Sequence, residues 1–140
     1  MSAQFANYGH AIAALAGWGL LMMVLSLLST SRLNSDNRTT SGLPRREYSD
    51  PGYRRFRAYA NAVETTGPFL AVTLAAILIG ANPFWVNLLA SVFLVSRIAT
   101  ALIHMFTENQ NARSASYIVG WLCMLGLAIF SILGAFSGVA

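Results

Sequence analysis

The sequence has no lysine and a single cysteine, Cys123, and only 10% of its 140 residues are charged. Soluble domains carry about 25% charged residues because much of a small domain faces water. So low a charge content excludes an ordinary soluble globular protein. The lone cysteine excludes an intrachain disulfide scaffold, and the hydrophobic content of 56% excludes a disordered chain. The length is that of one domain, and we expect residues 1–140 to form it.

Long apolar runs make up most of the chain. A helix needs about 20 mostly apolar residues to cross a bilayer. Residues 9–30 and 115–139 meet this need without a formal charge, whereas residues 56–81 and 84–106 are less uniform. The last two runs are separated by Asn82-Pro83, a turn signal that also ends a helix. The sequence therefore predicts an all-α membrane protein whose four spans form an up-down bundle.

The arginines indicate how the bundle is oriented. Six of the nine lie between residues 31 and 55, whereas residues 1–8 and the Asn82-Pro83 turn hold none. Arginine-rich short loops face the cytoplasm, so we expect loop 31–55 there and both termini on the other side. Without basic residues before it, the first span is expected to be a membrane helix rather than a signal peptide. We expect a multi-pass protein of a bacterial inner membrane or a eukaryotic intracellular membrane, whose loop arginines contact lipid headgroups and not nucleic acid.

The second span begins with polar residues that share one helix face. Arg57, Asn61 and Glu64 are spaced by four and then three residues, which places them within about 60° of one another. Ionisable side chains in a span are costly and by default face a bundle interior or a watery cavity. These three residues are therefore candidates for a polar site that opens to the cytoplasm.

The third span carries Arg97 and, seven residues later, His104. One interpretation is a buried ion pair between Arg97 and Glu64 that fixes the helix register. The other is a polar pocket with more cations than anions, which requires an anionic ligand. Its predicted lining is Arg57, Asn61, Glu64, Arg97, His104 and Arg113. The spacing of histidine and cysteine predicts no metal site.

Two segments resemble a known family. RAYANAVETTGPF, from Arg57 to Phe69, resembles the second-helix signature of the MAPEG family, membrane-associated proteins in eicosanoid and glutathione metabolism. That signature has an arginine-alanine pair, an asparagine, a glutamate and a proline-phenylalanine pair. The run from SRIATALIHMF to NARSASYIVGW resembles the third-to-fourth helix region of the microsomal glutathione transferases in this family. It has two arginines sixteen residues apart, Arg97 and Arg113, followed by Gly120-Trp121.

The resemblance implies a homotrimer of four-helix bundles that holds glutathione, as co-substrate, between neighbouring subunits near the cytoplasmic side. It implies that Arg57, Asn61 and Glu64 bind the tripeptide and that Arg113 is the catalytic arginine at its thiolate. Arg32 would be a further basic ligand. The chain departs from the family pattern at four positions, Phe56, Thr65, Thr100 and His104. Glutathione binding is therefore better supported than catalysis.

The activity that fits these residues is glutathione transfer to hydrophobic electrophiles, with peroxidase activity as an option. A thiol with a pKa of about 8.5 is mostly protonated at neutral pH, and an adjacent arginine favours the thiolate. Two alternatives stay open. A small four-span exporter would use Glu64 as its proton-binding carboxylate, and a non-catalytic MAPEG member would bind a lipid or a partner protein.

Overall fold

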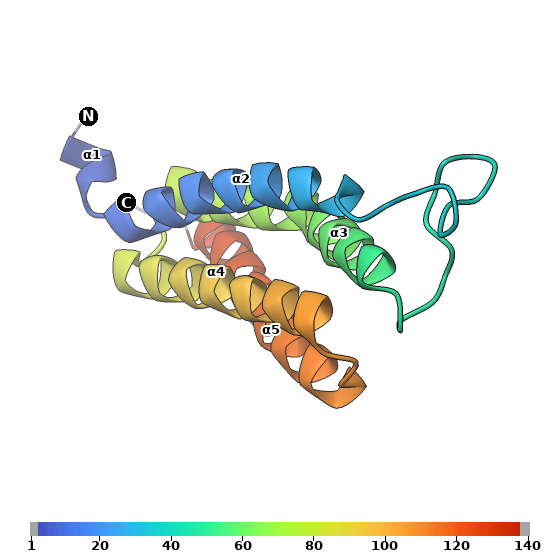
Figure 1. Ribbon diagram of the computed structural model, residues 1–140. Coiled ribbons are helices and arrows are strands. Elements are labelled where there is room, and N and C mark those ends of the chain that lie inside the picture. Colours follow the sequence, from blue (N-terminus) through green and yellow to red (C-terminus); the bar gives the residue numbers. More distant parts are fainter. Residues whose placement is uncertain (1–2, 138–140) are drawn as a thin grey trace.

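The computed structural model describes residues 3–137 and is helical throughout its ordered elements. The short α1 (Ala3–Ala6) precedes four long helices, α2 (Gly9–Thr30), α3 (Pro51–Leu78), α4 (Pro83–Phe106) and α5 (Gln110–Phe136). All four are long and apolar enough to cross a membrane. Figure 1 shows that consecutive long helices run in opposite directions, so the α2–α3 loop and the α4–α5 connection lie at one end, here called the loop end. The α3–α4 turn lies at the opposite end.

Two of the long helices, α3 and α5, begin at capping residues that precede their apolar runs. Asp50 accepts a hydrogen bond from the Gly52 amide at 2.8 Å, and Pro51 occupies the first turn. As a result α3 begins before the expected Phe56, because a proline and an N-cap side chain favour helix initiation there. In the same way the Asn109 side chain caps α5, which begins before the expected Ala115. The predicted end of the last span, at residue 139, lies outside the described residues.

An aromatic cluster joins three helices at the centre of the bundle. The rings of Phe69 and Phe93 stack with centroids 3.8 Å apart, and Trp18 packs edge-on against Phe93 at 5.2 Å. The Trp18 indole donates a hydrogen bond to the Thr66 hydroxyl at 3.3 Å. Large apolar side chains also cover the outside of the bundle. An apolar exterior is what a lipid environment requires, so the chain is an integral multi-pass membrane protein with the bilayer as its partner.

Arg54 attaches the long loop to the helices at the loop end. Its Nη1 donates to the carbonyl oxygen of Tyr48 at 2.7 Å and to that of Ser49 at 3.2 Å. The same nitrogen forms an ion pair with Glu108 at 3.2 Å, between α4 and α5. The C-terminal part of the loop is therefore held against the bundle rather than being a free tether.

Candidate functional site

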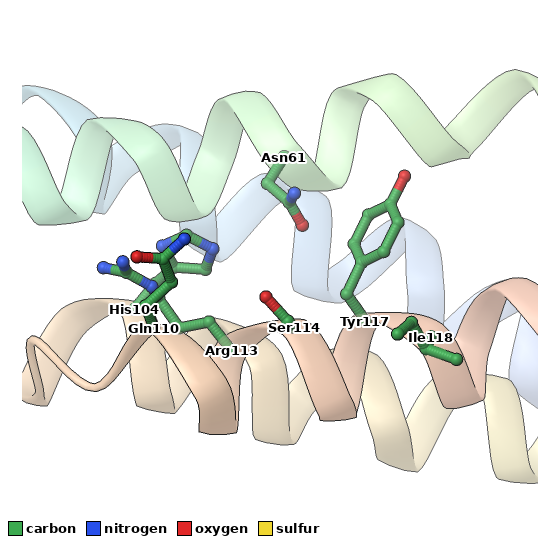
Figure 2. A pocket seen from close by; sticks show the side chains of 7 residues that line it. All are labelled: Asn61, His104, Gln110, Arg113, Ser114, Tyr117 and Ile118. Atoms are coloured by element: carbon green, nitrogen blue, oxygen red, sulfur yellow. The ribbon is translucent and has the colours of Figure 1, made fainter.

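An open pocket of about 380 Å³ lies between α3, α4 and α5 near the loop end (Figure 2). It is the place where the polar residues of three helices converge. Its lining consists of Asn61, His104, Gln110, Arg113, Ser114, Tyr117 and Ile118.

One stripe of α5 supplies most of this lining. Gln110, Arg113, Ser114 and Tyr117 follow the spacing of three, four and seven residues that places side chains on one helix face. In Figure 2 the ring of Tyr117 points from α5 toward α3, where the Asn61 side chain points back into the pocket. The stripe belongs to the first turns of α5, where the helix dipole adds positive potential. Sequence reasoning identified Arg113 but missed the other three residues, although their spacing was visible.

Arg97 is bonded to Asn61, which lines the pocket, and only 3% of its surface is exposed. Its Nη2 donates to Asn61 Oδ1 at 2.6 Å and to the Asn61 carbonyl oxygen at 3.0 Å. The centre of its guanidinium lies 4.8 Å from the centroid of the Tyr117 ring. Gly120 makes room for it, because a Cβ there would lie 3.0 Å from Arg97 Cδ.

The interpretation that pairs Arg97 with Glu64 is wrong, because the described residues contain no ion pair between these two side chains. Glu64 instead pairs with Arg57 on its own helix, with Nη1 and Oε1 3.9 Å apart, and its side chain is 56% exposed. Glu64 comes three positions after Asn61, so the two side chains differ by a rotation of about 60° around the helix. That rotation is enough to turn Glu64 toward the outside of the bundle, while Asn61 faces Arg97.

His104 and Arg113 meet a residue from the long loop. The Arg113 guanidinium lies 4.1 Å from the centroid of the Tyr48 ring. The same ring lies nearly parallel to that of His104, with centroids 6.5 Å apart. Tyr48 thus brings the long loop against one lining residue from α4 and one from α5.

Several donors of the two site arginines have no acceptor. Arg97 Nε, Arg97 Nη1 and Arg113 Nη1 are buried and make no hydrogen bond within residues 3–137. A buried donor without a partner is costly, more so when it is charged, and guanidinium groups bind carboxylates and other anions with strong hydrogen bonds. An acidic ligand would satisfy these donors, so the residues present fit an anionic peptide such as glutathione.

A second pocket of about 450 Å³ lies under the loop and beside the start of α3. It holds Arg57, which the sequence placed in the site, and adds Arg46 and Tyr48. Leu43, Pro44, Tyr53 and Phe56 complete its lining. Arg32, in contrast, is exposed at the end of α2 and belongs to the lining of neither of these pockets.

Comparison with known proteins identifies the family. Residues 9–133 match the model of the MAPEG family. The chain is also 32% identical over 99 residues to human prostaglandin E synthase, a match that covers 69% of this chain and 64% of that protein. The chain therefore spans less than two thirds of this relative's length. The family predicted from the second-helix residues is confirmed: this four-helix membrane protein belongs to the MAPEG family.

Proposed function

We propose that this protein binds glutathione and transfers its thiolate to hydrophobic electrophiles dissolved in the bilayer. One observation carries the proposal: Arg113 lines the pocket, Arg97 is bonded to the lining residue Asn61, and both guanidinium groups have buried donors without an acceptor within residues 3–137. An acidic, acceptor-rich ligand would stabilise that arrangement. The family membership, through its glutathione-metabolising members, selects glutathione among such ligands.

The chemical groups of glutathione match the side chains around the pocket. Its two carboxylates suit Arg57, which lines the second pocket, and Arg97, which Asn61 already orients beside the first. Its ammonium group suits Glu64. His104 would line the ligand's path, and Arg32, exposed at the end of α2, would contribute a further positive charge from the surface.

Arg113 is the proposed catalytic residue. Beside the ligand's sulfur, its guanidinium would stabilise the thiolate relative to the thiol, and each unit by which the thiol pKa falls corresponds to about 1.4 kcal/mol. The thiolate attacks the electrophilic carbon, a carbon–sulfur bond forms, and the leaving group departs with the electron pair of its bond. No side-chain nucleophile is required. With a hydroperoxide the thiolate would attack oxygen and break the O–O bond, which gives a sulfenic acid and an alcohol; a second glutathione would then form the disulfide and release water, which is peroxidase activity.

Charges on the outside of α3 support an oligomer. Glu64 and Arg57 lie on a membrane helix, yet their side chains are 56% and 31% exposed, and charged side chains facing lipid are costly. A neighbouring copy would cover them. We therefore propose a homotrimer with glutathione between subunits, both termini non-cytoplasmic and the arginine-rich loop in the cytoplasm.

Calorimetry of the detergent-solubilised protein with glutathione tests the binding. Arg113→Ala and Glu64→Gln should each weaken binding by about tenfold, as expected for the loss of one charged hydrogen bond. Arg38→Ala is the matched control, because this arginine is exposed in the loop and lines neither pocket. Equal affinity for glutathione in all four proteins would contradict the proposal.

Conjugation of glutathione to 1-chloro-2,4-dinitrobenzene tests the chemistry. We expect turnover in the wild type and its loss in Arg113→Ala at saturating glutathione. Binding without turnover would instead identify a non-catalytic member. The exporter alternative is not favoured, because its carboxylate must be free for a cation and Glu64 is paired with Arg57. Dissipation of a proton gradient in liposomes by a cationic drug, abolished in Glu64→Gln, would reverse that judgement.

A further inference from the structure

Tyr48 lines the second pocket and contacts two residues that line the first. It lines the second pocket together with Arg46 and Arg57. Its ring also lies against His104 and Arg113, which line the first pocket. The ring therefore lies between the second pocket, which it lines, and two lining residues of the first pocket, Arg113 and His104.

The backbone of Tyr48 is held firmly, whereas its ring is held weakly. Arg54 binds the carbonyl oxygens of Tyr48 and Ser49, which fixes the chain at this point. The ring contacts Arg113 through its face, His104 in parallel and Tyr53 edge-on. Within residues 3–137 the Tyr48 hydroxyl group makes no hydrogen bond. Rotation of the side chain about its first torsion angle would move the ring while the loop stays in place.

In its present position the Tyr48 ring covers one face of the Arg113 guanidinium, although Arg113 also lines the first pocket. Nη1 of Arg113 is buried and has no acceptor, while the Tyr48 ring covers the guanidinium at 4.1 Å. A ligand that is to use this donor must first uncover it. The Tyr48 ring can be displaced without breaking a hydrogen bond, because it is held by its cation–π and aromatic contacts.

We propose that Tyr48 is a gate: in the closed position its ring separates the two pockets and covers Arg113, and when displaced it joins them into one elongated site. The proposal rests on the function proposed above. It adds that an extended anionic thiol occupies both cavities, one end near Arg46 and Arg57 and the sulfur near Arg113. The contact between ring and guanidinium then competes with ligand binding.

Removal of the ring should therefore strengthen binding. Without the competing cation–π contact, Tyr48→Ala should bind glutathione about fivefold more tightly than the wild type. Tyr48→Phe keeps the ring. Because the hydroxyl makes no hydrogen bond within residues 3–137, this variant should keep the wild-type affinity for glutathione. Phe106→Ala is the control for the loss of an exposed aromatic side chain at the same end of α4. Weaker or unchanged binding in Tyr48→Ala would overturn the gate.

A second measurement needs no glutathione. Phenylglyoxal reacts with accessible guanidinium groups, and peptide mass spectrometry gives the rate at Arg113, with the exposed Arg38 as internal reference. The Arg113 rate should rise about fivefold in Tyr48→Ala and stay unchanged in Tyr48→Phe and Phe106→Ala. Equal rates in all variants would refute the gate even if glutathione binds. Conversely, a raised rate without any glutathione binding would support the gate and contradict the proposed function. Tyr48→Val gives the same comparison should the alanine variant not fold.

Discussion

The hydrogen bond between Arg97 and Asn61 should respond very differently to the loss of each partner. Asn61→Ala removes the acceptor at 2.6 Å and leaves the guanidinium buried, with only the backbone carbonyl of residue 61 as acceptor. Arg97→Met removes the same bond together with the buried charge. The two variants therefore separate the value of the bond from the cost of burying the charge.

The expected free energies have opposite signs. A hydrogen bond to a charged group contributes about 1.5–3 kcal/mol, so Asn61→Ala should lower the free energy of unfolding by about 2 kcal/mol. Replacing a buried charge by an apolar side chain of similar volume is often neutral or stabilising by about 1–4 kcal/mol. Two nitrogens of Arg97 make no hydrogen bond within residues 3–137, and water can reach Asn61 from the pocket. Arg97→Met should therefore equal or exceed the wild type in stability.

The lone cysteine provides the assay. Cys123 is the only thiol of the chain and is buried between the helices, so a dye that fluoresces on thiol reaction reports unfolding. In detergent we expect Asn61→Ala to melt roughly 5 °C below the wild type, as about 2 kcal/mol implies for a chain of this size. Arg97→Met should melt at the wild-type temperature or above, and Arg38→Met, in the exposed loop, serves as control.

The double variant decides the interpretation. If the cost of Asn61→Ala comes from the charge left behind, it should vanish when Arg97 is methionine, which gives a coupling of about 2 kcal/mol. A large loss of stability in Arg97→Met itself would refute the reasoning. It would mean that the arginine is a structural element of the bundle and that its unpaired donors are not kept for a ligand.

Three further outcomes follow from single contacts. Arg54→Ala should accelerate proteolysis of the loop several-fold, whereas Glu108→Gln should have little effect because exposed ion pairs contribute about 0–1 kcal/mol. Gly120→Val should weaken glutathione binding in calorimetry, since its side chain would occupy the space beside Arg97. Burial raises the pKa of the Tyr8 hydroxyl above its usual value of 10, so the stability it contributes is present below pH 10 and is lost as the pH rises through the folded-state pKa. Tyr8→Phe should remove that alkaline loss in thermal melts.

Hydropathy predicted the number and order of the long helices because the bilayer imposes a minimum apolar length on each. It predicted both ends of α2 but not where α3 and α5 begin. At α3 the start is set by Asp50 and Pro51, whose capping and fixed backbone torsion act outside the apolar run. The same holds for Asn109 at α5. These signals were present in the sequence, in Ser49-Asp50-Pro51-Gly52, but a hydropathy argument does not weigh them.

Helical spacing predicted part of the site in the same limited way. It placed Asn61, His104 and Arg113 together, and the structure brings these three to one pocket. It could not choose the partner of Arg97, because Asn61 and Glu64 differ by only about 60° around the helix, and the orientation of α3 against α4 decides between them. Tyr48 was beyond reach, since a loop residue has no periodicity that would bring it to a helix face.

The direction of the electric field at the pocket distinguishes a thiol-binding enzyme from a cation exporter. Arg113 lines the pocket and Arg97 is bonded to its lining residue Asn61; both have buried donors without an acceptor within residues 3–137, and the amino-terminal turns of α5 add to their potential. The carboxylate of Glu64, which an exporter would need there, points away and is neutralised by Arg57. In the low dielectric of a bundle interior such charges act strongly on a ligand. A cation would be repelled at the one place where the fold gathers polar groups, whereas a thiol that ionises there gains stabilisation when it becomes the reactive species.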